Sequence, residues 1–289
     1  MNELDGVLAR AERLLGRVEA MLSPEVAPQD WSARAWRWRR GRFGGRLQPV
    51  LHPHRIRLDE LQNIGTQKRE LDRNTRQFIA GLPANNALLW GSRGTGKSSL
   101  IKALLTEHGD AGLRLIEVEP QDLVDLPDIV ELVRGRDERF IVFCDDLSFE
   151  ADDPSYKALK AVLDGSVAGP AENVLIYATS NRRHLLPEFR RENLDTRVVD
   201  GEIHHGEAVE EKISLSERFG LWLSFYPFSQ EDYLEICFAW LRELGVVPDD
   251  AEEVRAEALR YALARGSRSG RVAWQFARDW AGRVGLLRS

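Results

Sequence analysis

The sequence predicts an α/β fold built on a parallel β-sheet, followed by a wholly helical C-terminal region. Short, nearly continuous apolar runs alternate with helical patterns, and these runs end before Pro227. Apolar strands separated by helices are typical of a parallel sheet that is covered on both faces. We therefore expect helices on both sides of a five-stranded sheet, with strands at Ala87–Trp90, Leu113–Val118, Phe140–Cys144, Asn173–Ala178 and Leu221–Phe225.

Helical patterns precede, connect and follow these strands. The first ones lie at Asn63–Gly81, Ser99–Leu105, Leu123–Arg134 and Pro154–Leu163. Ser229 and Asp232 have the spacing of a capping box that opens the first C-terminal helix. The C-terminal helices are expected at Tyr233–Leu244, Asp249–Arg265 and Arg271–Gly282. These patterns divide the chain into an N-terminal extension (1–57), an α/β domain (58–227) and a small helical domain (228–289).

A glycine-rich segment, Gly91–Ser98, connects the first expected strand to a helix. Strand, glycine-rich turn and helix form the P-loop arrangement, in which backbone N–H groups and a helix N-terminus face phosphate oxygens. Lys97 is expected on the β- and γ-phosphates, and Ser98 on Mg²⁺. The segment therefore predicts a bound nucleoside triphosphate. The expected contacts come from Gly91, Ser92, Arg93, Gly94, Thr95, Gly96, Lys97, Ser98 and Ser99.

Acidic and amide side chains follow two later strands. Asp145 and Asp146 end the third expected strand, and Asn181 ends the fourth. Since the carboxyl ends of parallel strands border the ligand crevice, these residues should face the phosphates. Asp145 is expected to hold Mg²⁺ through water. Asp146 is the expected base that activates water, with Glu150 as the alternative, and Asn181 is expected near the γ-phosphate.

Residues 31–57 combine aromatic and basic side chains without an acidic residue. Trp31, Trp36, Trp38 and Phe43 are interleaved with arginines. Such a segment could follow a nucleic-acid backbone, hold an acidic protein surface or pack on a neighbouring subunit. The arginines are Arg34, Arg37, Arg39, Arg40, Arg42, Arg46, Arg55 and Arg57. Residues 1–22 read as an amphipathic helix with a narrow apolar seam that packs on the chain itself or on another subunit.

Composition restricts the class of protein. Lys and Arg number 40 against 46 Asp and Glu, giving a net charge of -6, which argues against a general nucleic-acid coat. The N-terminus lacks the features of a signal peptide, and no apolar run is long enough to span a bilayer. Cys144 and Cys237 lie in apolar patterns, which indicates buried thiols rather than a disulfide or metal site. We expect a cytoplasmic protein.

These motifs together resemble the AAA+ ATPases. Besides the P-loop, the acidic pair and Asn181, the run Ser216–Gly220 looks like the arginine-finger box of branch-migration and clamp-loader-like motors. The resemblance implies ATP as substrate and Arg218 as a finger that reaches the ATP of a neighbouring subunit. An ion pair of Arg218 with Glu217 or Glu211 of its own chain is the alternative. Arg271 matches the sensor-2 arginine of a helical lid, with Arg268 as the fallback.

A closer likeness concerns the segments Ala84–Gly91 and Ser214–Phe228. They look like those of a family of stand-alone bacterial AAA+ proteins catalogued as a domain of unknown function. The family resemblance also places Ile64 against the adenine, although its loop lacks the acidic residue that related motors often carry. Asp146 stands where these motors usually have Glu, which bears on the rate of hydrolysis more than on nucleotide binding.

Three functions remain open from the sequence. The first is an oligomeric Mg-ATPase, a hexamer by family resemblance, that remodels a protein or nucleoprotein partner. The second is a slowly hydrolysing ATP-gated module that recruits partners through residues 1–57. The third is a small-molecule kinase, against which the finger box and the helical C-terminus argue. The segment Arg182–Glu217 is a candidate substrate-engaging insert, and its His204–His205 pair indicates solvated side chains rather than a zinc site.

Overall fold

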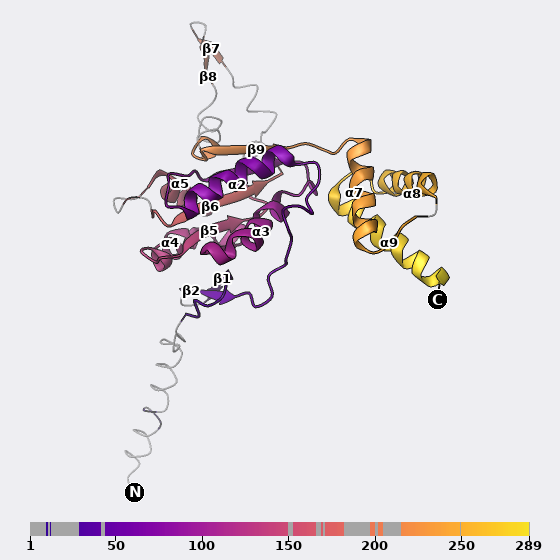
Figure 1. Ribbon diagram of the computed structural model, residues 1–289. Helices are drawn as coiled ribbons and strands as arrows, with labels where there is room; N and C mark the ends of the chain where they lie inside the picture. The colour runs from indigo at the N-terminus through magenta and orange to yellow at the C-terminus, as the bar shows by residue number, and fades with distance from the viewer. Residues whose placement is uncertain are drawn as a thin grey trace.

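The structure is a computed structural model, and it describes residues 10, 12, 29–41, 44–149, 153–165, 169, 171–181, 197–199, 202–204, 215–248 and 250–288. The expected helix over residues 1–22, the alternative base Glu150 and the segment 182–214 fall wholly or almost wholly outside these residues. Figure 1 shows the sheet with its covering helices and, beside it, the C-terminal helices.

The central sheet has seven strands in the order β2-β1-β4-β5-β6-β3-β9, so the expected number of five is corrected to seven. Every neighbouring pair is parallel except β1 and β2, which are antiparallel. The five expected strands are all present, as β3, β4, β5, β6 and β9. The strands are β1 (Ala35–Gly41), β2 (Gly44–Pro49), β3 (Ala87–Gly91), β4 (Leu113–Val118), β5 (Arg139–Cys144), β6 (Val174–Ser180) and β9 (Leu221–Phe225). A separate antiparallel pair consists of β7 (Arg197–Val199) and β8 (Glu202–His204).

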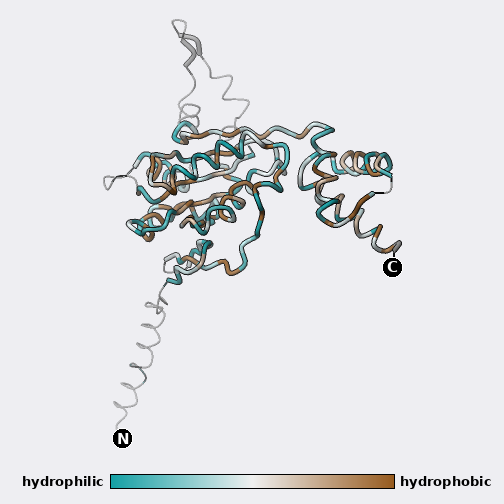
Figure 2. Tube along the Cα trace, in the orientation of Figure 1, coloured by the Kyte–Doolittle hydropathy of each residue, from teal (hydrophilic) through white to brown (hydrophobic). Residues whose placement is uncertain are grey.

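Helices cover both faces of the sheet. Along β3, Leu88 faces one apolar cluster while Ala87 and Leu89 face the other, as alternation along a strand requires. Helices α2 and α3 supply the cluster of Ala87, and α4 and α5 supply that of Leu88. Figure 2 shows the apolar strands between these helices. The helices are α2 (Gly65–Ile79), α3 (Lys97–His108), α4 (Leu126–Val133) and α5 (Pro154–Asp164), with 3₁₀ turns η1 (Gly109–Ala111) and η2 (Pro120–Asp125).

The helix expected at Leu123–Arg134 is split. Its first part belongs to the 3₁₀ turn η2, and the α-helix begins at Leu126. Pro127 explains the break: its ring restricts the preceding residues, and it has no N–H to donate to a carbonyl one turn earlier. At the start of a helix both properties are harmless.

The arginine- and tryptophan-rich segment forms the two additional strands. Trp36 and Trp38 are 0% and 3% exposed and join the apolar cluster of Leu88. On the opposite face of β1, Arg37 and Arg39 form ion pairs with Glu117 and Glu119 of the adjacent strand and loop, at 2.7 and 3.1 Å. The period-two alternation of Trp and Arg was therefore the signal of a strand whose faces meet an apolar core and a row of carboxylates.

We predict that Trp36→Ala lowers the free energy of unfolding by about 3–5 kcal/mol, because it removes a fully buried indole from the core. Equilibrium unfolding in denaturant measures the change. The matched control is Arg37→Ala in the same strand, whose partly exposed ion pair should contribute less than about 1 kcal/mol. Equal and small losses for both variants would show that β1 does not contribute to the stability of the sheet.

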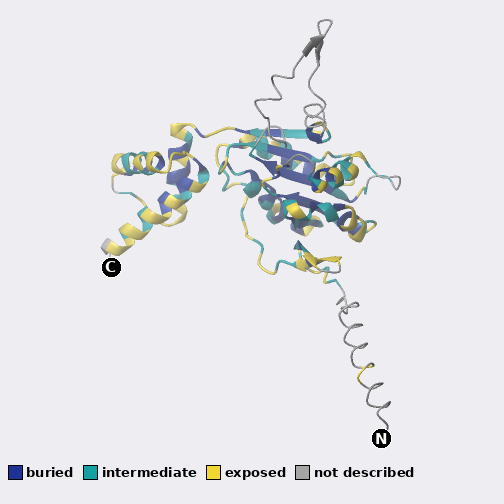
Figure 3. Cartoon of the chain, turned by 180° about the vertical axis from the view of Figure 1, so that it is seen from behind, coloured by how far each residue is buried: buried dark blue, intermediate teal, exposed yellow. Residues whose placement is uncertain are grey.

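The C-terminal helices α7 (Gln230–Glu243), α8 (Ala251–Ala264) and α9 (Gly270–Arg288) follow β9. The expected capping box is present: Ser229 accepts from the Asp232 backbone N–H, and the Asp232 side chain accepts from that of Ser229. Figure 3 shows a buried stripe on α7 among these helices. Tyr233 lies in this core, where its hydroxyl donates to the Ala258 carbonyl.

Candidate functional site

The Gly91–Ser98 turn connects β3 to α3 at the carboxyl end of the sheet, as expected. Gly91 and Gly94 have φ angles of 128° and 72°, in the region that favours glycine. A Cβ on Gly91 would lie 2.0 Å from the Phe225 carbonyl oxygen of β9. One on Gly94 would lie 2.8 Å from the Ser269 side chain. Both positions therefore require glycine. Gly91 allows the close approach of β9, and Gly94 allows that of Ser269, just before α9.

Lys97 is the first residue of α3 and is 6% exposed. Its Nζ donates to the carbonyl oxygens of Gly91 and Ser92, both at 2.7 Å, and to Oδ1 of Asn181 at 3.2 Å. Burial lowers the pKa of Lys97 to about 8, although Asp146 and Asp145 act in the opposite direction. The ammonium group is thus held within the turn, between the P-loop and the end of β6.

Ser98 and Asp145 meet beside this ammonium group. The Ser98 hydroxyl donates to Oδ1 of Asp145 at 2.5 Å, and the Thr179 hydroxyl donates to the same oxygen at 2.6 Å. Thr179 in turn accepts from the Asp146 backbone N–H at 2.8 Å. Hard cations such as Mg²⁺ prefer this kind of oxygen donor, and Mg²⁺ commonly takes one or two protein ligands together with phosphate oxygens. Ser98 and Asp145 therefore fit such an ion.

Asp146 occupies an unusual backbone position. Its φ is 55°, in the left-handed region, which Asp adopts more readily than most residues. Its exposed carboxylate accepts a hydrogen bond from Nδ2 of Asn181 and pairs with Arg93 at 3.7 Å. The backbone turn and these two partners direct the carboxylate toward the P-loop.

A cleft of about 800 Å³ joins these groups. Lys97, Asp145, Asp146 and Asn181 line it, and so does Arg271 from the start of α9. The backbone N–H of Gly270 donates to the Gly94 carbonyl at 2.8 Å, which fixes the start of α9 on the P-loop. The remaining residues expected at this site that line the cleft are Ile64, Arg93, Gly94, Thr95, Gly96, Ser98 and Ser99.

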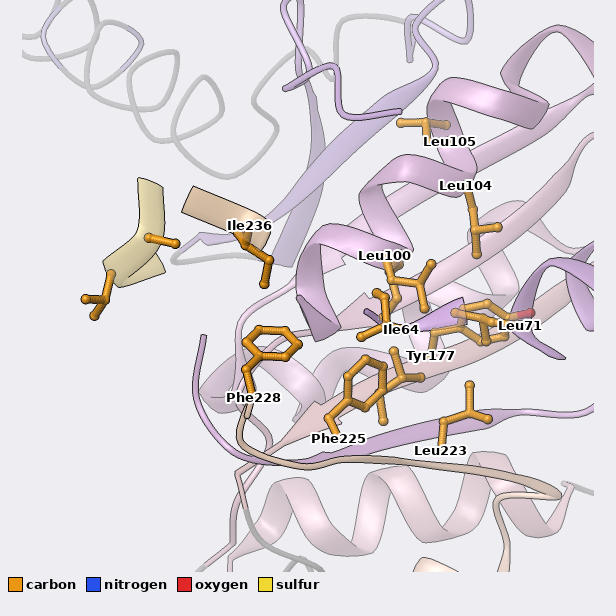
Figure 4. Packing of buried hydrophobic residues seen from close by; sticks show 14 of the residues in the cluster. Ile64, Leu71, Leu100, Leu104, Leu105, Tyr177, Leu223, Phe225, Phe228 and Ile236 are labelled. Atoms are coloured by element: carbon orange, nitrogen blue, oxygen red, sulfur yellow. The ribbon is translucent and has the colours of Figure 1, made fainter. Parts of the chain in front are cut away.

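Ile64 lies directly beside the phosphate-binding turn. It is 4% exposed, and its Cδ1 lies 3.6 Å from the position of a Cβ on Gly96. Figure 4 shows Ile64 in the apolar cluster with Leu100, and with Phe228 and Ile236 from the C-terminal part of the chain. Arg268, the fallback for Arg271, is exposed and does not line the cleft.

Arg218 lies outside the cleft of its own chain. Its Nε donates to Asp164 at the end of α5, and the two side chains form an ion pair. Asp164 is thus one intrachain partner of Arg218, and the alternative partner Glu211 lies outside the described residues. The arginine side chain is 22% exposed.

Several aromatic and basic residues of the segment 31–57 are engaged within the chain. Trp36 and Trp38 are buried, so their rings do not present a surface on which bases could stack. Trp31 packs under Arg136, with 3.9 Å between guanidinium carbon and ring centroid. The arginines of β1 and its approach bind carboxylates in the pairs Arg34–Asp110, Arg37–Glu117, Arg39–Glu119 and Arg40–Asp125. These tryptophans and arginines, which could have indicated a nucleic-acid surface, therefore stabilise the sheet.

The structure adds cleft residues that sequence reasoning missed. His54 and Arg55 reach the cleft from the connection between β2 and α2, and Trp240 and Trp274 reach it from α7 and α9. Trp274 follows Arg271 by one helical turn, so the i,i+3 spacing could have placed it on the same face. Trp240 carries no comparable local signal.

Among the described residues, no group of three or more His, Cys, Asp or Glu side chains lies close enough together to hold a metal ion by itself. In the same part of the chain, every helix is too short or too polar to cross a bilayer.

A family model described as protein of unknown function (DUF815) matches residues 31–284. The chain belongs to the DUF815 family. A mutant of RuvB from Thermotoga maritima is 17% identical, with 82% of this chain and 69% of that chain covered and a TM-score of 0.54. A second RuvB mutant from the same organism is 16% identical, with 81% and 67% covered and a TM-score of 0.53.

The AAA domain of FIGL-1, solved in complex with ADP, is 18% identical, with 80% and 73% covered and a TM-score of 0.51. No curated protein matches the chain. At these identities the likeness concerns the fold, which is that of the AAA+ domains.

Proposed function

We propose that this protein binds ATP and hydrolyses it with Mg²⁺. The observation that carries the proposal is the convergence, in one cleft, of the glycine turn, the Lys97 ammonium and the Ser98–Asp145 pair. A triphosphate supplies phosphate oxygens that the N–H groups of the turn and the Lys97 ammonium can bind. The AAA+ fold and the ADP bound to the FIGL-1 domain support a nucleotide as ligand.

The chain's own residues suit phosphoryl transfer to water. In this proposal Lys97 and the turn N–H groups bind the phosphates, while Asp146 accepts a proton from the attacking water. Asn181 donates to Asp146 and contacts Lys97, so it holds the base and the phosphate-binding group in one frame. Ser98 and Asp145 would hold Mg²⁺, which neutralises phosphate charge. Arg271 reaches the γ-phosphate from the C-terminal helices, which act as a lid.

We further propose that the active form is an oligomer, a hexamer by likeness to AAA+ proteins, in which Arg218 serves the neighbouring cleft. The position of Arg218 outside its own cleft supports this arrangement. The assembly would use hydrolysis to remodel a protein or nucleoprotein partner. The division into an α/β domain (58–227) and a helical lid (228–289) is part of the proposal. Strands β1 and β2, within residues 35–49, also belong to the central sheet.

A second candidate function is an ATP-gated recruitment module that hydrolyses slowly. The observation that favours it concerns Asp146, whose side chain is shorter than that of Glu. Its carboxylate already binds Asn181 and Arg93. Steady-state phosphate release separates the two functions. A rate that matches the rate of Lys97→Ala would favour the module, and a rate well above it the motor.

We predict that Lys97→Ala lowers ATP affinity by about 2–5 kcal/mol, because it removes the buried cation that faces the phosphates. Titration calorimetry with Mg-ATP measures the affinity. The matched control is Lys157→Ala on the exposed face of α5, which should bind ATP like the unchanged chain. Equal affinity in all three chains would contradict the proposed function.

A further inference from the structure

Thr179, a buried residue near the end of β6, holds the loop that carries the acidic pair. It is 1% exposed and lines the cleft. Its hydroxyl donates to Oδ1 of Asp145 at 2.6 Å and accepts from the Asp146 backbone N–H at 2.8 Å. Its carbonyl accepts from the Leu147 N–H at 2.7 Å. One residue thus binds three consecutive residues that follow β5.

The position of Thr179 follows from the pairing of β5 with β6. Cys144 lies opposite Ala178 in the parallel register, so Thr179 is level with the first acid after β5. Alternate side chains of a strand share a face, and Tyr177 belongs to the cluster that α2 and α3 supply. The Thr179 side chain therefore points to the face on which α3 begins, where Ser98 lies in the first turn.

These contacts restrict how Asp145 presents its carboxylate. Ser98 and Thr179 both donate to Oδ1, at 2.5 and 2.6 Å. A carboxylate oxygen has two lone pairs, so the two hydroxyls occupy Oδ1 and leave Oδ2 for further donors, such as water held by a cation. Residues that bind a metal-facing carboxylate in this way fix its orientation.

The second contact of the hydroxyl acts on the backbone of Asp146. This residue has a φ of 55°, a left-handed conformation that is strained for most side chains. Because one hydroxyl both donates and accepts, Thr179 joins the Asp145 carboxylate to the backbone turn at Asp146. Asn181, two residues later, binds the Asp146 carboxylate. The end of β6 thus holds both acids.

We propose that Thr179 is a positioning residue for the divalent cation that accompanies the nucleotide. It acts through Asp145 and the turn of Asp146, without binding the phosphates itself. This inference rests on the proposed function, because it concerns the cation of the same Mg-ATP. The proposal requires a hydroxyl at position 179, so an apolar side chain of the same shape does not suffice.

Thr179→Val tests the proposal, since it replaces the hydroxyl by a methyl group and keeps the shape of the side chain. Calorimetry on the full chain measures ATP affinity over a range of Mg²⁺ concentrations and in EDTA. We expect the variant to need about 10- to 100-fold more Mg²⁺ for the same ATP affinity, the range for loss of a residue that orients a metal ligand. ATP affinity in EDTA should stay nearly unchanged, because the P-loop is intact.

Thr179→Ser retains the hydroxyl and should restore most of the Mg²⁺ affinity. Thr75→Val is the matched control. Thr75 is 0% exposed, and its hydroxyl binds the Leu71 carbonyl and the Tyr177 hydroxyl, but it does not line the cleft. Its loss should lower the thermal midpoint in circular dichroism without changing the Mg²⁺ dependence. If Thr179→Val does not fold, Thr179→Ala repeats the comparison without a methyl group against the carboxylate.

Two results would overturn the positioning role. The first is a Mg²⁺ dependence of Thr179→Val equal to that of the unchanged chain, which would leave Thr179 a role in stability only. The second is a Thr179→Ser variant that behaves like Thr179→Val, which would assign the effect to the lost methyl group. Failure of the proposed function looks different: the unchanged chain then binds no ATP, with or without Mg²⁺, and Lys97→Ala makes no difference.

Discussion

Arg218→Ala should slow ATP hydrolysis by about 10³-fold or more while leaving ATP affinity nearly unchanged. In phosphoryl transfer, negative charge spreads over the γ-phosphate oxygens, and a guanidinium supplied by a neighbour offers two donors in a planar fork. Arg218 does not line the cleft of its own chain, so its removal should slow hydrolysis in the cleft of the adjacent subunit. Steady-state phosphate release at saturating Mg-ATP measures it.

A mixing experiment tests whether Arg218 acts between subunits. Arg218→Ala retains Lys97, and Lys97→Ala retains Arg218, so a mixed assembly contains interfaces at which both groups are intact. We expect two separately inactive chains to regain activity when combined. Arg260→Ala is the control, because its partner Glu257 lies one turn away on the exposed side of α8. If no mixture regains activity, the finger does not act in trans.

The Asp164 partner provides a second comparison. If Arg218 serves only its own chain through the ion pair with Asp164, Asp164→Ala should reproduce both the rate loss and any loss of thermal stability. If Arg218 is a finger, Asp164→Ala leaves the guanidinium in place and most of the activity remains. The two variants therefore separate a role in folding from a role at the neighbouring cleft.

Asp146→Asn should lower the hydrolysis rate by about 10²- to 10⁴-fold, the range expected for loss of a general base. Asparagine has the same shape and tolerates the left-handed backbone at this position, so the change removes charge without new strain. Its amide oxygen can still accept from Asn181. ATP affinity should therefore change little, which calorimetry with Mg-ATP would verify.

Glu150→Gln is the matched comparison for the base. If Asp146 is the base, Glu150→Gln retains hydrolysis. If Glu150 is the base, the two effects are exchanged, with a large loss in Glu150→Gln and a small one in Asp146→Asn. A comparable small effect in both would mean that neither carboxylate limits the chemical step.

Local sequence patterns predicted five strands of the sheet and many of the residues that line the cleft. The five apolar runs became strands, and the glycine turn, the acids after β5 and Asn181 after β6 came together at one end of the sheet. This succeeded because the carboxyl ends of parallel strands share an edge, so residues at strand ends meet whatever their separation in the chain. Arg271 reached the same cleft from α9.

The basic segment shows where sequence reasoning fell short. Trp36-Arg37-Trp38-Arg39 alternates with the period of a strand, yet a strand is stable only with a partner, and the partner of β1 is β4 in the α/β region. The glutamates that pair with Arg37 and Arg39 lie in β4 and just after it, so they are equally distant from β1 along the chain. Without that pairing, the same residues are equally compatible with an exposed basic arm.

Local patterns were enough to predict the strand–turn–helix at Gly91–Ser98, the five apolar strands and the capped start of α7, because each depends on neighbours a few residues away. The folded chain was needed to show that β1 and β2 complete the sheet, that Arg218 pairs with Asp164, and that Trp240 packs against Trp274 in the cleft. Those contacts join residues that are distant along the chain. Their formation depends on which faces pack together, and periodicity within a segment does not encode that choice.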